Sequence, residues 1–316
     1  MKKVKEKQDL RHCFKMPDIE SFWKKKVEEC RKKPFQLTVK EVKQPLKSMK
    51  VFKMSYRALD GEKIIAFKLL PAQRTSKKIP FLVHIHGFMG RKGFPFQYAH
   101  WIEMGIGVLA ADYRGQGGET KNNCKYKSGI PNKLMTLGIL DKNEFYLGKI
   151  YLDTLRTFFL TKSFKETDSG KIIIEGGSQG GGATVAVSGI LGKEVFAAMA
   201  DVPSYSQILC RIREKTGSFS QIEDYLNKHP GKRKQILENM SYFDNINLAE
   251  GITCPIICSV GLADPICPPK NFFPVYAKIS SKKELRKYPG AGHEGGGRRQ
   301  ENEKINWLGK ILASKR

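Results

Sequence analysis

The sequence predicts one α/β domain, in which helices cover both faces of a mainly parallel, twisted sheet. Short apolar runs typical of buried strands alternate with longer helix-prone segments along most of the chain. The length of 316 residues exceeds the common domain size, but one α/β core can hold a chain of this length, so we expect residues 1–316 to form a single domain. The core strands are expected at residues 82–85, 108–112, 172–175, 197–202, 256–260 and 285–288.

Additional elements are expected before, within and after this core. Residues 1–34 form an N-terminal arm with a helix over residues 18–31. Residues 203–251 are polar and helix-prone with no strand pattern, which predicts a helical lid over the carboxyl edge of the sheet. Three strand-like runs follow the arm, at residues 36–42, 50–56 and 64–70. A last helix is expected over residues 299–312.

A G-x-S-x-G pentapeptide, residues 176–180, stands between the apolar run 172–175 and a small-residue segment. A strand, a sharp turn and a helix in this order form a nucleophile elbow, in which flanking glycines let the backbone turn tightly and expose the Oγ of Ser178. The helix start directs free N–H groups and a positive dipole end to the same point. The pattern indicates acyl transfer, although a glycine-rich turn without chemistry is the alternative.

An acid and a base follow the serine in the order that this architecture requires. Asp264 lies in the loop after the strand expected at 256–260, and His293 lies in a glycine-rich loop after the last strand. An N-cap role for Asp264 is the weaker interpretation, because Pro265 and Pro268-Pro269 separate it from the helix expected near Lys270. A histidine in such a loop is otherwise an ordinary solvated side chain.

The turn at residues 86–90 is expected to complete an oxyanion hole. One N–H comes from the residue after the nucleophile, Gln179, and the other from the turn after a core strand, most consistently from Phe88. A plain glycine turn is the alternative. His84 and His86 alternate on a strand, but no third ligand stands at a metal-like spacing, so neither a metal nor a cofactor is expected.

Separated motifs together resemble the acetyl xylan esterase and cephalosporin C deacetylase family of α/β-hydrolases, from Met16 to the C-terminus. The motifs are Gly93-Phe94-Pro95, Arg114-Gly115-Gln116-Gly117, Gly138-Ile139-Leu140-Asp141, residues 176–182, Asp201-Val202-Pro203, Ser241-Tyr242-Phe243-Asp244, Ile266-Cys267-Pro268-Pro269 and His293-Glu294-Gly295-Gly296-Gly297. The resemblance implies the α/β-hydrolase fold and assigns the catalytic roles to Ser178, Asp264 and His293. It also implies that the substrate is a small acetylated carbohydrate or cephalosporin C.

The resemblance further implies a homohexamer, with a dimer at low salt as the alternative. The chain departs from the family in two places. Phe88 stands where the family usually has Tyr, so the backbone donor remains but a phenol contact is lost. The segment between Gln116 and Gly138, which in the family helps line subunit contacts, is shorter and rich in Lys. The resemblance leaves open the roles of Arg114, Gln116 and Glu294, for which pairing within the loops behind the triad is favoured over direct chemistry.

The net charge of +25 and the pI of about 9.7 would normally suggest a polyanion ligand. However, the basic residues are 42 Lys and 14 Arg spread along the chain. Nucleic-acid-binding proteins instead tend to group Arg with aromatic residues. A solvated lysine surface is expected, with no specific nucleic-acid partner. A non-enzymatic polyanion-binding protein remains an alternative, as does another serine hydrolase such as a general short-chain esterase or a peptidase of the prolyl oligopeptidase type.

The sequence also predicts a cytoplasmic location and no membrane partner. No apolar run approaches the roughly 20 residues that cross a bilayer. The basic start at residues 1–5 is followed by Glu6, Gln8 and Asp9 in place of the apolar core of a signal peptide. The seven cysteines, an odd number without paired spacing, are typical of free thiols in a reducing compartment.

Overall fold

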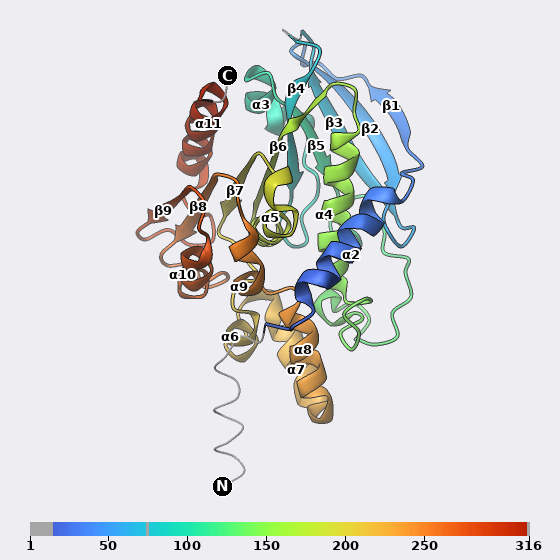
Figure 1. Ribbon diagram of the computed structural model, residues 1–316, viewed down its shortest axis with the longest axis vertical. Helices are drawn as coiled ribbons and strands as arrows, with labels where there is room; N and C mark the ends of the chain where they lie inside the picture. Colours follow the sequence, from blue (N-terminus) through green and yellow to red (C-terminus); the bar gives the residue numbers. More distant parts are fainter. Residues whose placement is uncertain (1–14, 74–75, 315–316) are drawn as a thin grey trace.

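A nine-stranded sheet lies at the centre of the computed structural model, which describes residues 15–73 and 76–314 (Figure 1). Within these residues the strand order is β1-β2-β3-β5-β4-β6-β7-β8-β9. The strands are β1 (Thr38–Val42), β2 (Met49–Arg57), β3 (Lys63–Pro71), β4 (Ile79–Ile85), β5 (Gly107–Ala111), β6 (Thr167–Gly177), β7 (Ala197–Asp201), β8 (Ile256–Gly261) and β9 (Lys283–Tyr288).

The sheet is parallel from β5 through β9, whereas β1, β2 and β3 pair antiparallel with one another and β3 pairs antiparallel with β5. The predicted α/β class is therefore confirmed, and each expected core strand is present. The antiparallel strands come from the strand-like runs before residue 72, and they extend the sheet on the β5 side. Parallel strands place their carboxyl ends on one edge, where functional loops gather.

Helices cover both faces of the sheet (Figure 1). They are α2 (Ile19–Lys32), α3 (Ala99–Glu103), α4 (Tyr146–Lys162), α5 (Gln179–Leu191), α6 (Ile208–Arg213), α7 (Ser220–Lys228), α8 (Arg233–Ser241), α9 (Asn245–Leu248), α10 (Pro269–Lys278) and α11 (Gly297–Ala313). Apolar residues of α2, α4, α5 and α10 belong to the cluster on one face, and those of α3 and α11 to the cluster on the other.

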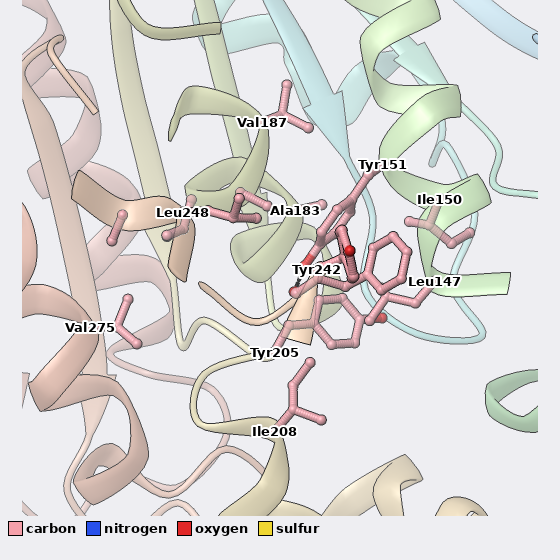
Figure 2. Packing of buried hydrophobic residues seen from close by; sticks show 14 of the residues in the cluster. Leu147, Ile150, Tyr151, Ala183, Val187, Tyr205, Ile208, Tyr242, Leu248 and Val275 are labelled. Carbon is pink, nitrogen blue, oxygen red and sulfur yellow. Dashed lines mark hydrogen bonds between the residues drawn. The ribbon is translucent and has the colours of Figure 1, made fainter. Parts of the chain in front are cut away.

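Two hydrophobic clusters result from the period-two alternation of the strands. In β6, Ile172 and Ile174 face the cluster under α4 and α5, whereas Ile173 faces the cluster under α11. Figure 2 shows part of the first cluster, where Tyr151 of α4 lies with Ala183 of α5 in the same packed layer. This layer supports the first turns of α5, which begins at the proposed nucleophile.

The N-terminal helix confirms the expectation of a helix over residues 18–31, and residues 1–14 of the expected arm lie outside the described chain. Trp23 of α2 is 4% exposed, and its indole N–H donates to the backbone oxygen of Tyr242 at 2.9 Å. Ile19 is likewise buried. The apolar face of α2 is therefore used within the chain.

The segment 203–251 contains helices α6 to α9 and, in the structure, no strand. Figure 1 shows α6, α7 and α8 grouped beyond one end of the sheet. The segment begins directly after β7, whose carboxyl end lies beside that of β6. This position suits the expected lid, whose action on the site stays a prediction. Among the described residues, no helix is both long and apolar enough to span a membrane.

Candidate active site

Ser178 occupies the turn between β6 and α5, with backbone angles φ 58° and ψ −117°. This conformation is sparsely populated for residues with a side chain and costs about 1–3 kcal/mol, so the surrounding structure must hold it. The Ser178 N–H donates to Asp201 O at 2.9 Å. The Ser178 carbonyl accepts from the N–H groups of Gly182 at 2.9 Å and Ser204 at 3.0 Å. These bonds fix the elbow in the expected strained form.

The glycines of the elbow allow α5 to approach the sheet backbone. A Cβ on Gly180 would lie 2.0 Å from the carbonyl oxygen of Ile85, and a Cβ on Gly176 would lie 2.5 Å from the same atom. Neither contact is possible for a real side chain. The helix start is consequently pressed against the end of β4, where the turn with the predicted oxyanion donor begins.

The structure brings the three residues predicted for the triad into one hydrogen-bonded chain. His293 Nε2 lies 2.9 Å from Ser178 Oγ, and His293 Nδ1 lies 2.8 Å from Asp264 Oδ2. With Nδ1–H donating to the carboxylate, Nε2 is left to accept the serine proton. The His293 side chain is 29% exposed and the Asp264 side chain is fully buried, so the carboxylate is shielded from solvent while the imidazole and the half-buried Ser178 are accessible.

Asp264 is held by the backbone that follows it. Its Oδ1 accepts from the N–H groups of Ile266 at 2.8 Å and Cys267 at 2.9 Å. Burial disfavours the charged carboxylate, but the hydrogen bonds from His293 and from the Cys267 N–H outweigh it and lower the pKa of Asp264. The carboxylate is therefore ionised and fixed in direction. Asp264 does not cap α10, whose N-cap is Pro268.

The two expected oxyanion donors lie on the elbow and on the neighbouring turn. The Gln179 N–H belongs to the first residue of α5, and within residues 15–73 and 76–314 neither it nor the Phe88 N–H has an acceptor. Two other N–H groups of the turn are occupied, since Met89 donates to Gln116 Oε1 at 2.7 Å and Gly90 donates to Gly87 O at 2.9 Å. Both predicted donors are thus unoccupied within the described residues.

Gln116 connects this turn to the elbow, a role that the sequence left open. Its Oε1 accepts from Met89 N, while its Nε2 donates to Tyr146 Oη at 2.9 Å and to Gln179 Oε1 at 3.0 Å. Gln179 Oε1 also accepts from Tyr205 Oη at 3.0 Å. The two glutamine side chains therefore set the spacing between the loops that carry the donors. A polar residue after an Arg-Gly pair was the signal in the sequence.

Arg114 pairs with helix α4 and with the turn between β2 and β3, whereas Glu294 pairs within its own loop. The buried Arg114 guanidinium donates to both carboxylate oxygens of Asp153, at 2.6 and 2.7 Å, and to Asp60 at 2.6 Å. Glu294 Oε1 accepts from Gly292 N at 3.0 Å, in the loop that carries His293. Both residues thus stabilise loop conformations near the triad.

His86 orders the turn before Phe88 and does not form a metal pair with His84. Its Nδ1 lies 2.7 Å from Gly87 O, and its Nε2 accepts from Tyr113 N at 2.8 Å. Burial lowers the pKa of His86 to about 4, so the imidazole is neutral. His84 Nδ1 lies 2.6 Å from Glu175 Oε2, which directs it to a different partner.

A buried ion network lies behind the elbow, on the α11 face of the sheet. Lys304 Nζ contacts Glu175 Oε1 at 2.6 Å and Asp201 Oδ2 at 2.7 Å. Asp201 Oδ1 accepts from Gln300 Nε2 at 2.7 Å. Burial disfavours the Glu175 carboxylate, but Lys304 and His84 outweigh it and lower its pKa. Because Asp201 O also accepts from Ser178 N, this network supports the strand end that holds the nucleophile.

Replacing Lys304 by methionine is expected to lower the free energy of unfolding by about 3–5 kcal/mol, because it leaves Glu175 and Asp201 buried without their cation. Lys310→Met, on an exposed position of the same helix, should change it by less than about 0.5 kcal/mol. Urea unfolding checks both variants. The pKa of Glu175 lies below its ordinary value of 4.5. The ionised carboxylate therefore stabilises the folded state above pH 4.5, and this contribution is lost as the pH falls through the lowered pKa. Equal unfolding energies for the two variants would contradict this account.

A cavity of about 830 Å³ adjoins the oxyanion turn. Its lining includes Phe88 and Met89 of the turn together with Asn122, Asn132 and Gln221. The triad itself does not line it. The cavity is therefore a neighbouring space, bounded by the oxyanion turn, the Lys-rich segment and α7.

The chain is similar to known proteins over nearly its whole length. Residues 4–311 match the family model described as acetyl xylan esterase (AXE1). An acetyl xylan esterase from Paenibacillus sp. R4 is similar in structure with a TM-score of 0.87 and 32% identity, over 94% of this chain and 95% of that one. Acetyl xylan esterase 1 from Thermoanaerobacterium sp. JW/SL YS485 also has a TM-score of 0.87, with 24% identity over 96% and 98% of the two chains.

A curated relative is longer than this chain. The acetyl esterase Axe7A of Xylanibacter ruminicola is 24% identical over 275 residues, which are 84% of this chain and 61% of the relative. The match therefore spans less than two thirds of that protein. The likeness to the solved esterases covers nearly all of both chains, and it establishes the α/β-hydrolase fold.

Proposed function

Because this chain belongs to the acetyl xylan esterase family, we propose that it is a serine carboxylesterase that removes acetyl groups from acetylated xylo-oligosaccharides and related small esters, including cephalosporin C. The observation that carries the proposal is the continuous chain of hydrogen bonds from Asp264 through His293 to Ser178. It lies beside two N–H groups placed for an oxyanion. These are the parts that acyl transfer requires.

The reaction follows from the positions of these groups. His293, oriented by Asp264, accepts the Ser178 proton as Oγ attacks the ester carbonyl. The oxyanion accepts from the N–H groups of Gln179 and Phe88, which need no rearrangement because the elbow and the turn are already fixed. His293 then protonates the leaving alcohol. Water, deprotonated by His293, releases acetate by the reverse sequence and restores the free serine.

The neighbouring cavity supports a carbohydrate on the alcohol side. Its lining includes Asn122, Asn132, Gln221 and Tyr126. Amide side chains donate and accept hydrogen bonds, and the oxygens of Asn122 and Gln221 already accept from Tyr126 Oη at 2.9 Å and from Met135 N at 3.3 Å. Neutral hydroxyl-rich molecules are recognised by such groups, whereas a lipid chain requires an apolar tunnel. This lining favours a sugar ester over a long-chain ester.

Rates on a panel of acetylated xylo-oligosaccharides, acetylated monosaccharides and cephalosporin C test the proposal. We expect acetate release from the oligosaccharides and from cephalosporin C, with the highest kcat/KM identifying the favoured alcohol. An aminoacyl p-nitroanilide serves as the comparison for a peptidase. Cleavage of the anilide with no release of acetate from any sugar would replace this proposal by another serine hydrolase activity.

Acetyl esters are expected to react much faster than butyryl or longer esters. Each methylene that a closed pocket cannot accept forfeits about 1–3 kcal/mol of transition-state binding, or about 10- to 200-fold in kcat/KM. A series of p-nitrophenyl esters from acetate to octanoate measures the decline while the leaving group stays constant. Similar kcat/KM values for acetate and octanoate would indicate a general or lipase-like esterase.

We further propose that copies of this chain associate, as a hexamer at physiological salt. Exposed apolar residues support association, since Phe94 and Phe96 are stacked on each other and are 50% and 63% exposed. The lysines of the segment 121–133 oppose it less than their number suggests, because Lys127 pairs with Glu144 at 3.1 Å and Lys133 with Asp224 at 3.4 Å. Trp23 of α2 is buried within the chain and is not available for such a contact.

The assembly is expected to control access of large substrates. A closed hexamer should deacetylate short oligosaccharides and exclude polymeric xylan, whereas an open dimer should accept both. Light scattering at high and low salt, alongside rates on oligomer and polymer, measures the link, and Phe96→Glu should lower the mass. A hexamer that deacetylates intact xylan as fast as short oligosaccharides would contradict control by enclosure.

A further inference from the structure

A third potential metal ligand stands beside the acid and the base of the triad. Cys267 lies three residues after Asp264, and one donor atom each of Asp264, Cys267 and His293 lies within 4.8 Å of the others. Asp264 and Cys267 are buried, whereas His293 is partly exposed and offers a path from solvent. The proposed reaction uses the carboxylate and the imidazole but has no role for the thiol.

These three donors are of the types that bind Zn²⁺ in proteins. Cys sulfur, His nitrogen and Asp oxygen together supply three ligands and leave a fourth position for water. With Zn–S of about 2.3 Å and Zn–N of about 2.0 Å, donors in a tetrahedral site stand roughly 3.3–3.8 Å apart. Since the three donor atoms lie no more than 4.8 Å apart, shifts of about 1 Å bring them to these separations. The loop of His293 contains Gly290 and Gly295, both with positive φ, and can supply this shift.

We propose that Asp264, Cys267 and His293 form an inhibitory site for a soft divalent cation such as Zn²⁺ or Cd²⁺. The Cys267 proton leaves to solvent as the thiolate binds. If the cation binds His293 Nδ1, the proton on that atom moves to Nε2, which then cannot accept from Ser178. If it binds Nε2, it takes the lone pair that accepts from Ser178. In either position the imidazole no longer serves as the base. The cation therefore stops hydrolysis while leaving Ser178 chemically intact.

The environment of the thiol agrees with this role. Cys267 is 6% exposed, so its thiol is shielded from solvent. A buried thiol of this kind is a poor nucleophile and does not compete with Ser178. When a cation displaces the thiol proton, the Cys267 sulfur becomes a metal ligand.

Zinc titration of p-nitrophenyl acetate hydrolysis tests the proposal. We expect inhibition that EDTA reverses. Cys267→Ser should raise the zinc concentration for half-inhibition by about tenfold or more, measured against the uninhibited rate of that variant, since even loss of a residue supporting a ligand costs about this much. Cys124→Ser removes a partly exposed thiol that lines the cavity, and it should leave zinc sensitivity unchanged. Equal sensitivity of Cys267→Ser and the intact chain, or activation by zinc, would overturn the site.

Cadmium binding provides a readout that does not depend on esterase activity. In a chain with Cys13, Cys124 and Cys210 replaced by serine, one equivalent of Cd²⁺ should produce ultraviolet thiolate-to-metal absorption. Replacing His293 by alanine should weaken this binding, and Cys267→Ala should abolish it. If the Cys267 variants do not fold, the cadmium absorption of the His293→Ala variant still tests the site. Absorption that is absent, or unchanged when the imidazole is removed, would refute the site even if the esterase proposal holds.

Discussion

Replacing Ser178 by alanine is expected to lower kcat for acetyl ester hydrolysis by about 10⁴-fold or more, with a small residual rate from the two oxyanion donors. The hydroxyl is the only part of the reacting chain that the change removes. Ser178 lies at φ 58°, and alanine has no more difficulty with this angle than serine. The elbow should therefore keep its form and substrate binding should persist. Steady-state rates and acetate release give the measurement.

Ser188→Ala supplies the matched control for this change. Ser188 lies on the same helix, is buried, and within the described chain its Oγ has no hydrogen-bond partner. Its removal should leave kcat within about twofold and should not lower stability, because an unpaired hydroxyl contributes nothing once buried. If Ser178→Ala retained more than about 1% of the activity while Ser188→Ala was unchanged, another nucleophile would be at work.

Asp264→Asn is expected to lower kcat by about 10⁴-fold, through the tautomer of His293. Oδ1 accepts from the N–H groups of Ile266 and Cys267, so the asparagine must keep its oxygen there and turn its NH₂ toward His293 Nδ1. Nδ1 then accepts, and the ring proton moves to Nε2. An Nε2–H cannot accept from Ser178 Oγ, so the general base is lost although all three side chains remain in place.

The effect should appear in kcat, with KM changed little, because the substituted group does not meet the substrate. Nitrogen NMR of the imidazole reports the tautomer directly, with Nε2 protonated in the variant and Nδ1 protonated in the original chain. Ser259→Ala, on the preceding strand, provides a comparison in which a buried hydroxyl that contacts Asp201 is removed without touching the triad. A decrease of less than about 100-fold for Asp264→Asn would argue against His293 as the base.

Local sequence patterns were sufficient to predict the elements that carry the candidate site. The apolar run 172–175 followed by glycines fixes a strand-to-helix turn, and the structure has β6 ending at Gly177 and α5 starting at Gln179. Asp264 and His293 were predicted because each lies in a loop after an expected strand, in the order that this architecture requires, and parallel strands bring such loops to one edge. Once the two loops lie at the same edge, the side chains of Asp264 and His293 are long enough to form a hydrogen bond.

Contacts between distant segments were not predictable from these patterns. Lys304 pairs with Glu175, 129 positions earlier, although a lysine on an amphipathic helix is normally solvated. Gln116 bridges the turn at Met89 and the elbow, which required the relative placement of three loops. The sequence indicates no role for Cys267 beyond its place in a motif, because its proximity to His293 depends on how two loops meet. Pairing across the fold, not local propensity, decides these roles.

The central claim is that Ser178 is the nucleophile for acetyl ester hydrolysis. Treating the protein with an alkyl p-nitrophenyl phosphonate, which labels activated serines irreversibly, and mapping the label by peptide mass spectrometry tests it most directly. The account predicts one label per chain, on the peptide containing Ser178, with deacetylation of xylo-oligosaccharides lost in proportion to labelling. A fully labelled Ser178 with deacetylation intact, or inactivation with the label on another residue, would contradict it.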